Sequence, residues 1–252
     1  MQTLIVASSN LLQYLILQFK PASRLLHELP IVHLSNHPPP TTRHINATMI
    51  PLRNPTALSP PTTTTSPSSS PTITPPPLPF LTGPWHVTHS TLPMWRKARN
   101  VVITYTPIAN TSPPQIDDVV TYQPLNSEAV KTVHGVDKPT NQSAEGAEEV
   151  GLDTSASLSY TWRGKGWLAI ATSKWEILGY GEELGTGNTW VVTYFAKTLF
   201  TPAGLDIYSR KGELAPKTVE EIRAGLAGLG GLVGKLAEGV FEVGMDGGGR
   251  KE

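Results

Sequence analysis

Two histidines, His89 and His134, are the side chains in this 252-residue chain best suited to moving a proton near neutral pH. Each lies in a run of alternating residues, so strand parity decides which side the imidazole faces. His89 has the parity of Trp85, and His134 shares the more apolar face of the run 130–136. We therefore expect both histidines to face a protein interior. There they either transfer a proton to a substrate or form hydrogen bonds as part of its lining.

Other kinds of reactive site have little support. The chain has no cysteine, which excludes disulfides, thiolate nucleophiles and cysteine-ligated metals. Two histidines supply only half of a zinc site, and no His, Asp or Glu at ligand spacing completes it, so we predict neither a metal nor a cofactor. There is no Gly-x-Ser-x-Gly motif. The segment Gly164-Lys165-Gly166 is not followed by the helix that a phosphate loop requires.

Two acidic residues, Glu176 and Asp206, lie inside predicted strands. A carboxyl group that faces inward would have a raised pKa and could act as a general acid or base. A carboxyl group that faces outward would be an ordinary solvated side chain, and this is the orientation that we expect for both.

The elements that position these residues are strands, because apolar residues recur with a period of two from residue 81 onward. Beta-branched and aromatic residues fill the runs, and glycine-containing turns separate the later ones. Such a succession predicts an all-β chain forming an eight-stranded up-and-down antiparallel barrel, since closure removes both sheet edges. An open sandwich is the alternative. The expected runs are 85–90, 101–105, 119–122, 130–136, 158–163, 167–180, 190–198 and 205–210.

The first and last runs carry a pair of residues suited to closing one end of a barrel. The first begins with Gly83-Pro84-Trp85, and the last ends at Arg210. A guanidinium group can lie over an indole face, and such a cation–π contact is worth roughly 0.5–2 kcal/mol. We predict that Gly83, Trp85 and Arg210 are structural and that the ligand binds toward the opposite end.

The composition changes near residue 80. Residues 1–79 hold most of the prolines and a single acid, Glu28, which predicts a disordered leader. Its first part has features of a transit segment, and translation from Met49 is the alternative. We expect the barrel over 80–212, a C-terminal helix over 213–243 and a flexible tail over 244–252.

The C-terminal segment has an apolar stripe with helical spacing, interrupted by glycines. We expect residues 216–227 to form a helix that packs on the barrel. Residues 228–243 either continue this helix or become ordered only against a partner or a membrane surface. In the second case, membrane contact through residues 226–241 is possible. The stripe comprises Val219, Ile222, Leu226, Leu229, Val233, Leu236 and Val240.

These features together resemble the lipocalins. Gly83-Pro84-Trp85 resembles their Gly-x-Trp signature, and residues 92–100 look like their first large loop. Residues 205–210, followed by residues 214–222, are similar to the last strand, arginine and helix of the bacterial-lipocalin and apolipoprotein D branch. The resemblance covers residues 81–226 and implies a calycin-like barrel that binds small hydrophobic molecules. It departs from the family near the seventh strand, where Thr193-Tyr194-Phe195 does not match the usual Thr-Asp-Tyr-like motif.

The predicted function is therefore binding or carriage of a small hydrophobic ligand in the barrel. A cavity-based acid–base enzyme is the alternative: an isomerase, cyclase or dehydratase with His89 and His134 as catalytic residues. A net charge of zero gives no long-range attraction to nucleic acid, and the absence of cysteine favours an intracellular site, either cytoplasmic or mitochondrial. The predicted ligand-binding residues are His89, Tyr105, Tyr122, His134, Trp162, Trp175 and Tyr194.

Overall fold

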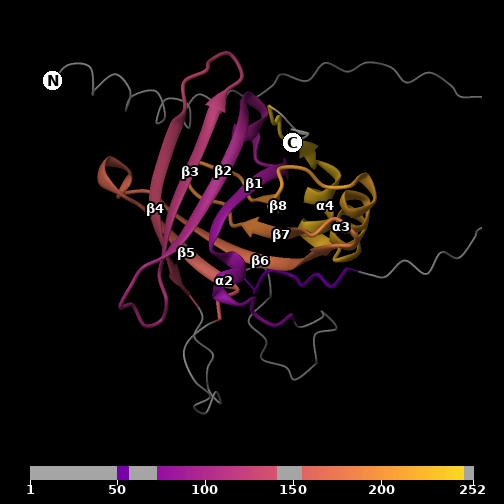
Figure 1. Ribbon diagram of the computed structural model, residues 1–252, viewed down its shortest axis with the longest axis horizontal. Coiled ribbons are helices and arrows are strands. Elements are labelled where there is room, and N and C mark those ends of the chain that lie inside the picture. Colours follow the sequence, from indigo (N-terminus) through magenta and orange to yellow (C-terminus); the bar gives the residue numbers. More distant parts are fainter. Residues whose placement is uncertain (1–49, 57–72, 141–154, 247–252) are drawn as a thin grey trace, which may run out of the picture. The chain divides into compact units, whose positions relative to one another are not determined.

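The computed structural model describes residues 50–56, 73–140 and 155–246, all within one compact unit, Met49–Glu252. Eight antiparallel strands follow one another in chain order, and β1 pairs with both β2 and β8, which closes the sheet (Figure 1). The predicted eight-stranded up-and-down antiparallel barrel is confirmed, and the open sandwich is wrong. The strands are β1 (Gly83–Ser90), β2 (Ala98–Pro107), β3 (Ile116–Pro124), β4 (Lys131–Pro139), β5 (Ser159–Gly164), β6 (Thr172–Glu183), β7 (Asn188–Phe195) and β8 (Gly204–Ser209).

The alternation of side chains divides the apolar residues into an interior cluster and an outer cluster. Along β7, Val191 and Phe195 belong to the interior cluster, whereas Trp190, Val192 and Tyr194 belong to the outer one. A strand that is apolar on both faces must be covered on both. The outer face of β6 to β8 therefore needs a covering layer.

Two C-terminal helices supply that layer, α3 (Pro216–Gly228) and α4 (Gly231–Glu238), which lie beside β7 and β8 (Figure 1). The predicted single helix is interrupted because Gly230 has a φ of 66°, a conformation that glycine adopts without strain. After α4, strand β9 (Phe241–Glu242) pairs with β1.

The apolar stripe of the C-terminal segment faces the barrel. Ile222, Leu226 and Val233 are at most 1 % exposed, and Leu232 is the large apolar side chain of this segment that is exposed, at 41 %. None of the helices in the described part of the chain is long and apolar enough to span a membrane.

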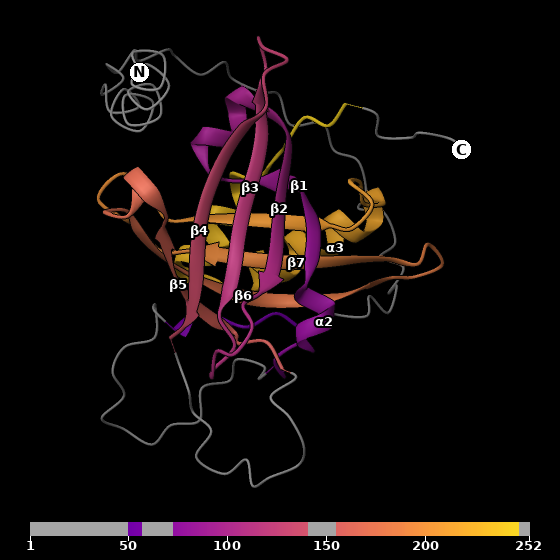
Figure 2. The ribbon, with the colours of Figure 1, turned by 60° about the vertical axis from the view of Figure 1, so that its left-hand side comes forward.

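One end of the barrel is closed by the predicted pair. The Arg210 guanidinium lies 3.7 Å from the centroid of the Trp85 ring, and Trp85 is fully buried. Arg210 also donates hydrogen bonds to the backbone oxygens of Pro84, Phe80 and Thr82, at 2.6, 2.5 and 2.7 Å. Phe80 lies in the short helix α2 (Leu78–Leu81), at this end of the barrel (Figure 2). One arginine thus joins the last strand to the segment that leads into the first.

Residues 50–56 form a strap across the outside of β6, although they lie within the predicted leader. Leu52 is 2 % exposed and wedges between β6 and α3. A Cβ atom on Gly179 would lie only 2.3 Å from the Leu52 Cδ2 atom. Residues 73–79 also pack on the barrel, with Ile73 in the interior cluster. The remainder of the leader, 1–49 and 57–72, lies outside the described residues, as does most of the tail, 247–252.

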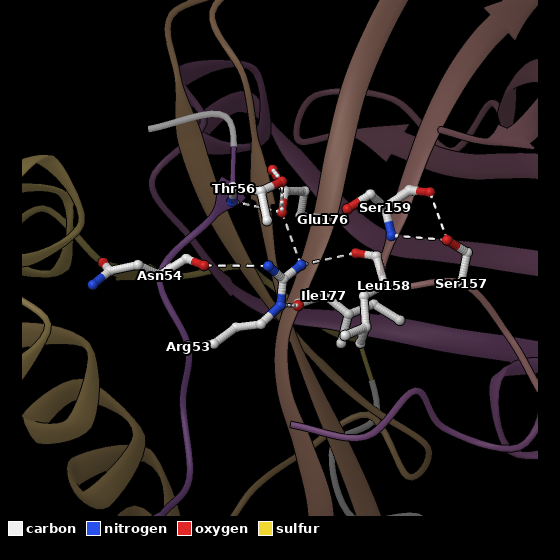
Figure 3. Close-up of polar contacts among 8 residues, drawn as sticks. All are labelled: Arg53, Asn54, Thr56, Ser157, Leu158, Ser159, Glu176 and Ile177. Atoms are coloured by element: carbon white, nitrogen blue, oxygen red, sulfur yellow. Dashed lines mark hydrogen bonds and ion pairs between the residues drawn. The ribbon is translucent and has the colours of Figure 1, made fainter. Parts of the chain in front are cut away.

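The strap is held by a buried ion pair between Arg53 and Glu176 (Figure 3). The Arg53 Nη2 atom lies 2.8 Å from the Glu176 carboxylate, and its Nε atom donates to the Ile177 carbonyl at 2.8 Å. Thr56 donates its backbone N–H to the same carboxylate at 2.9 Å. Glu176 faces outward as expected, but it is buried rather than solvated, with 5 % of its surface exposed.

Replacing Arg210 with Ala will destabilise the barrel without changing its ligand preference. The substitution removes the cation–π contact and three charge-assisted hydrogen bonds, and we expect a loss of about 2–4 kcal/mol in the free energy of unfolding. Urea denaturation measures the loss. The control is Arg163→Ala, which removes one exposed hydrogen bond to the Ala169 carbonyl and should cost little. Equal stability of the two variants would contradict the structural role of Arg210.

Replacing Arg53 with Ala will leave the Glu176 carboxylate buried without its cation, at a cost of about 3–5 kcal/mol. Thermal and urea denaturation report this loss. The double variant R53M/E176L should be less destabilised, because neither partner then carries a buried charge. The exposed pair Lys217–Glu221 provides the control, since K217A should change stability by at most about 0.5 kcal/mol. If the double variant were no more stable than R53A, the unpaired charge would not be the cause.

Candidate functional site

The barrel interior contains a stack of three aromatic side chains. Trp175 on β6 lies between Tyr160 on β5 and Tyr105 on β2, with ring centroids 4.7 and 5.7 Å apart and interplanar angles of 20° and 12°. All three are at most 2 % exposed. They bring flat apolar surface and three polar tips into the barrel.

A second aromatic group is only partly buried. Tyr122 and Phe195 lie near the ends of β3 and β7 that point away from Trp85, and Trp162 lies on β5; each packs against the interior cluster. Trp95, in the 3-10 helix η2 (Pro93–Lys97) between β1 and β2, packs edge-on against Tyr122 with centroids 5.7 Å apart. We call Trp95, Tyr122, Trp162 and Phe195 the aromatic rim. Phe195 links it to the interior stack, 6.5 Å from Trp175.

Two aspartates, Asp118 and Asp137, lie within the interior near the stack. Asp118 is the cross-strand partner of Tyr105 on one side and of Gly135 on the other, and Asp137 follows Gly135 on the same face of β4. They are 6 % and 0 % exposed. The Trp175 indole N–H donates to the Asp137 Oδ1 atom at 2.7 Å.

The pKa values of both carboxyl groups are raised. Burial raises the pKa of Asp118 to about 7, and the neighbouring charge of Asp117 adds to the shift. Burial, together with the charge of Asp118, raises the pKa of Asp137 well above its ordinary value. Both shifts favour the protonated, uncharged form of the carboxyl groups relative to an exposed aspartate.

Two carboxyl oxygens of this region face the interior. The Asp118 Oδ1 and Asp137 Oδ2 atoms are buried and have no hydrogen-bond partner among the described residues, and the buried Tyr208 hydroxyl lies in the same interior. An unsatisfied buried polar group costs about 1–3 kcal/mol. We define Asp118, Asp137 and Tyr208 as the polar cluster. Its orphaned atoms make it the part of the interior best suited to hold the polar groups of a bound molecule.

A third buried acid, Asp206 on β8, also faces the interior, contrary to our expectation of a solvated side chain. It is 1 % exposed and accepts hydrogen bonds from the Ser90 hydroxyl at 2.5 Å and the Trp95 indole at 3.3 Å. Burial raises the pKa of Asp206 to about 7, although both hydrogen bonds oppose the shift. Through these two hydrogen bonds, Asp206 connects Trp95 of the aromatic rim to strands β1 and β8 of the barrel.

Four of the predicted ligand-binding residues lie together inside the barrel: Tyr105, Tyr122, Trp162 and Trp175. Tyr194 has the opposite parity and belongs to the outer cluster beneath the helices. Its predicted interior position is therefore wrong, because the outer face of β7 is as apolar as the inner one. Ligand contact by the four interior residues stays a prediction.

His89 does not face the interior, because the pairing register of β1 with β8 shifts between Val87 and His89. Such a bulge changes the parity on which our prediction relied. The side chain instead lines an outer hollow of about 1030 Å³ beside α3, together with Arg223 and Glu242. Burial lowers its pKa.

His134 also lies on the outer face. Its Nε2 atom is 2.9 Å from the Asp117 carboxylate, which also binds the Lys165 ammonium group at 2.5 Å. The inner face of β4 carries Gly135, where a Cβ atom would lie 2.2 Å from the Trp162 ring. The more apolar face of β4 is therefore its outer face, which is why the predicted inward position of His134 is wrong. From these positions, neither histidine can act on an interior ligand.

The polar cluster was missed by the sequence analysis. Asp118 precedes the β-branched run 119–122 and Asp137 follows the run 130–136, so both were assigned to strand ends. Extending the period-two pattern from Val120 to Asp118 would have placed that carboxyl group inside. Across the described segments, no three His, Asp or Glu side chains are grouped so that they could hold a metal ion.

Comparison with known proteins gives only distant similarity. No family model and no curated protein matches the sequence. Among solved structures, lobster apocrustacyanin A1 is 12 % identical over 66 % of this chain and 78 % of that chain, with a TM-score of 0.42. The siderocalin Ex-FABP is 14 % identical over 57 % of this chain and 83 % of that one, with a TM-score of 0.34. Because both scores are below 0.5, the assignment of the fold rests on the strand order and the closure of the barrel.

Replacing Asp206 with Asn will change the pH dependence of stability. The folded protein holds a proton on Asp206 up to about pH 7, whereas the unfolded chain releases it near the ordinary value of 3.8. The stability contributed by this proton is complete below the unfolded value and is lost as the pH rises through about 7. From pH 8 to pH 5, the free energy of unfolding of the wild type should therefore rise by about 2–3 kcal/mol relative to D206N.

Urea denaturation at several pH values measures this difference. Glu128→Gln serves as a control, because the Glu128 side chain is 89 % exposed and the variant should follow the wild type. Parallel pH profiles of the wild type and D206N would show that the Asp206 carboxyl group is not protonated in the folded protein.

Proposed function

We propose that the barrel interior binds one small, flat and mostly apolar molecule, which enters at the aromatic rim. The observation that carries this proposal is the continuity between the partly buried rim and the buried stack around Trp175. Binding sites for small molecules are typically apolar and aromatic, with a few convergent polar groups. The aromatic side chains and the polar cluster supply these two components.

The rim also suggests how a molecule would enter. η2 lies across the connection between β1 and β2, and Trp95 anchors it through Asp206 and Tyr122. The opposite end is closed by Trp85 and Arg210. Entry at the rim would therefore require displacement of a short segment, whereas entry at the other end would break the closure of the barrel.

A proton-transfer enzyme acting on the same bound molecule is the second candidate. It is favoured by the different pKa values of Asp118 and Asp137, because one carboxyl group can donate a proton while the other accepts one. These two aspartates replace His89 and His134 as candidate acid and base. Loss of turnover in both D118N and D137N, with retained ligand binding, would support this candidate, because an amide cannot transfer the proton.

Replacing Tyr122 with Leu will weaken binding of flat apolar compounds. Loss of one aromatic contact should reduce affinity about 3–10-fold, corresponding to roughly 0.7–1.4 kcal/mol. Naphthalene is a suitable probe because it is flat and has no polar group. Isothermal titration with the protein in the syringe measures the affinity and should give one molecule for each barrel.

The matched control is Tyr194→Leu, which removes the same side chain from the outer cluster and should leave naphthalene affinity unchanged. Equal weakening by both substitutions would contradict binding inside the barrel. Failure of naphthalene and of a panel of sterols, polyketides and haem to bind at micromolar concentrations would overturn the proposal. Native mass spectrometry of protein from its own source would identify a molecule that co-purifies.

A further inference from the structure

We infer that the interior selects uncharged ligands in which a hydrogen-bond acceptor adjoins a donor, as in a lactam, and that Asp137 and Asp118 bind these two groups. This inference rests on the proposed function, since it names the ligand class of the same site. Neither aspartate was among the residues that the sequence analysis selected. The role of each carboxyl group follows from which of its oxygens already has a hydrogen-bond partner in the protein.

Asp137 provides the donor. Its Oδ1 atom accepts the Trp175 indole N–H at 2.7 Å, which leaves the proton of the neutral acid on Oδ2. Oδ2 is buried and finds no partner within the described part of the chain. An O–H group held in this way can donate to a ligand carbonyl oxygen. The hydrogen bond from Trp175 also fixes the direction in which the proton points.

Asp118 provides the acceptor. Its cross-strand pairing with Tyr105 and Gly135 places it on the same inner face as Asp137, one strand away. Diagonal neighbours of this kind lie about 7–8 Å apart between Cα atoms, close enough for two side chains to reach one small ligand group. The Asp118 Oδ1 atom is buried and unpartnered among the described residues, so it can accept a ligand N–H.

Tyr208 lies in the same interior as these two carboxyl groups. Its side chain is 0 % exposed and belongs to the interior cluster, and its hydroxyl group interacts with Tyr105 and Thr193. Buried polar groups normally have a hydrogen-bond partner. Two carboxyl oxygens on β3 and β4, unpartnered among the described residues, therefore share one interior, which a purely structural core would not require.

The charged groups around Asp118 and Asp137 disfavour binding of an anionic ligand. The titratable groups that act on the polar cluster are Asp117, Tyr105 and Tyr160, on β3, β2 and β5, together with Asp206 on β8. None of these carries a positive charge. A carboxylate or phosphate ligand would therefore face acids without a compensating cation, whereas a lactam adds no charge.

Calorimetry with 2-quinolinone and 1-methyl-2-quinolinone tests the inference on the intact chain. The two compounds have the same flat ring system and carbonyl group, but only the first has an N–H donor. We expect 2-quinolinone to bind at least about tenfold more tightly, because a buried acceptor left unpaired penalises the methylated analogue. Equal affinities would overturn the inference.

Variants separate the two roles. D118L should abolish the preference for the N–H compound. D137L should weaken both quinolinones at least about tenfold, whereas D137N should retain most of the affinity, since its amide N–H₂ group can replace the O–H donor. E128Q is the control and should match the wild type, because the Glu128 side chain is 89 % exposed and lies outside the polar cluster. Equal affinities of D137N and D137L for 2-quinolinone would contradict the donor role.

A measurement on the unsubstituted protein covers the case in which a variant does not fold. Because burial raises the pKa of Asp118 to about 7, its acceptor strength increases over this range, and the preference for 2-quinolinone should be larger at pH 8 than at pH 6. A preference that does not change would contradict the role of Asp118. If naphthalene binds but no quinolinone preference appears, this inference fails and the proposed function stands; if neither class binds, both fail.

Discussion

The contact between Arg210 and Trp85 is the interaction on which the rest of the barrel depends. A closed sheet requires its first and last strands to pair, and Arg210 extends from the end of β8 to three carbonyl groups that precede or begin β1. Closure then gives every strand a single inner face. The interior stack, the aromatic rim and the polar cluster all follow from which residues have that parity.

This dependence explains how much of the molecule could be predicted from sequence. The strands, their order, the plug and the inward positions of Tyr105 and Trp175 follow from local alternation and the end motifs. The outward orientation of His89 could not be predicted, because a bulge after Val87 reverses the alternation of side chains and no residue type in the sequence marks this bulge. His134 could not be placed because the inner face of β4 is lined by Gly135 and Asp137 rather than by apolar side chains.

The strap and the helices show a second limit of sequence reasoning. Residues 50–56 lie in a segment whose average composition predicts disorder, yet Leu52 and Arg53 each find a specific partner on the barrel. Composition averages over a window, whereas a buried ion pair depends on two residues more than one hundred positions apart. Because Leu52 contacts both β6 and α3, the strap also couples the barrel wall to its helical cover.

The buried acids narrow the earlier expectation of a hydrophobic ligand. A purely apolar interior would accept fatty acids as readily as neutral ring systems, with their carboxylates left at the rim. In this barrel, Asp118, Asp137 and Asp206 occupy the inner faces of β3, β4 and β8, and burial raises the pKa of each. An added anion would raise these pKa values further and oppose its own binding. A neutral molecule that brings its own donor and acceptor would instead satisfy oxygens that the fold leaves unpaired among the described residues.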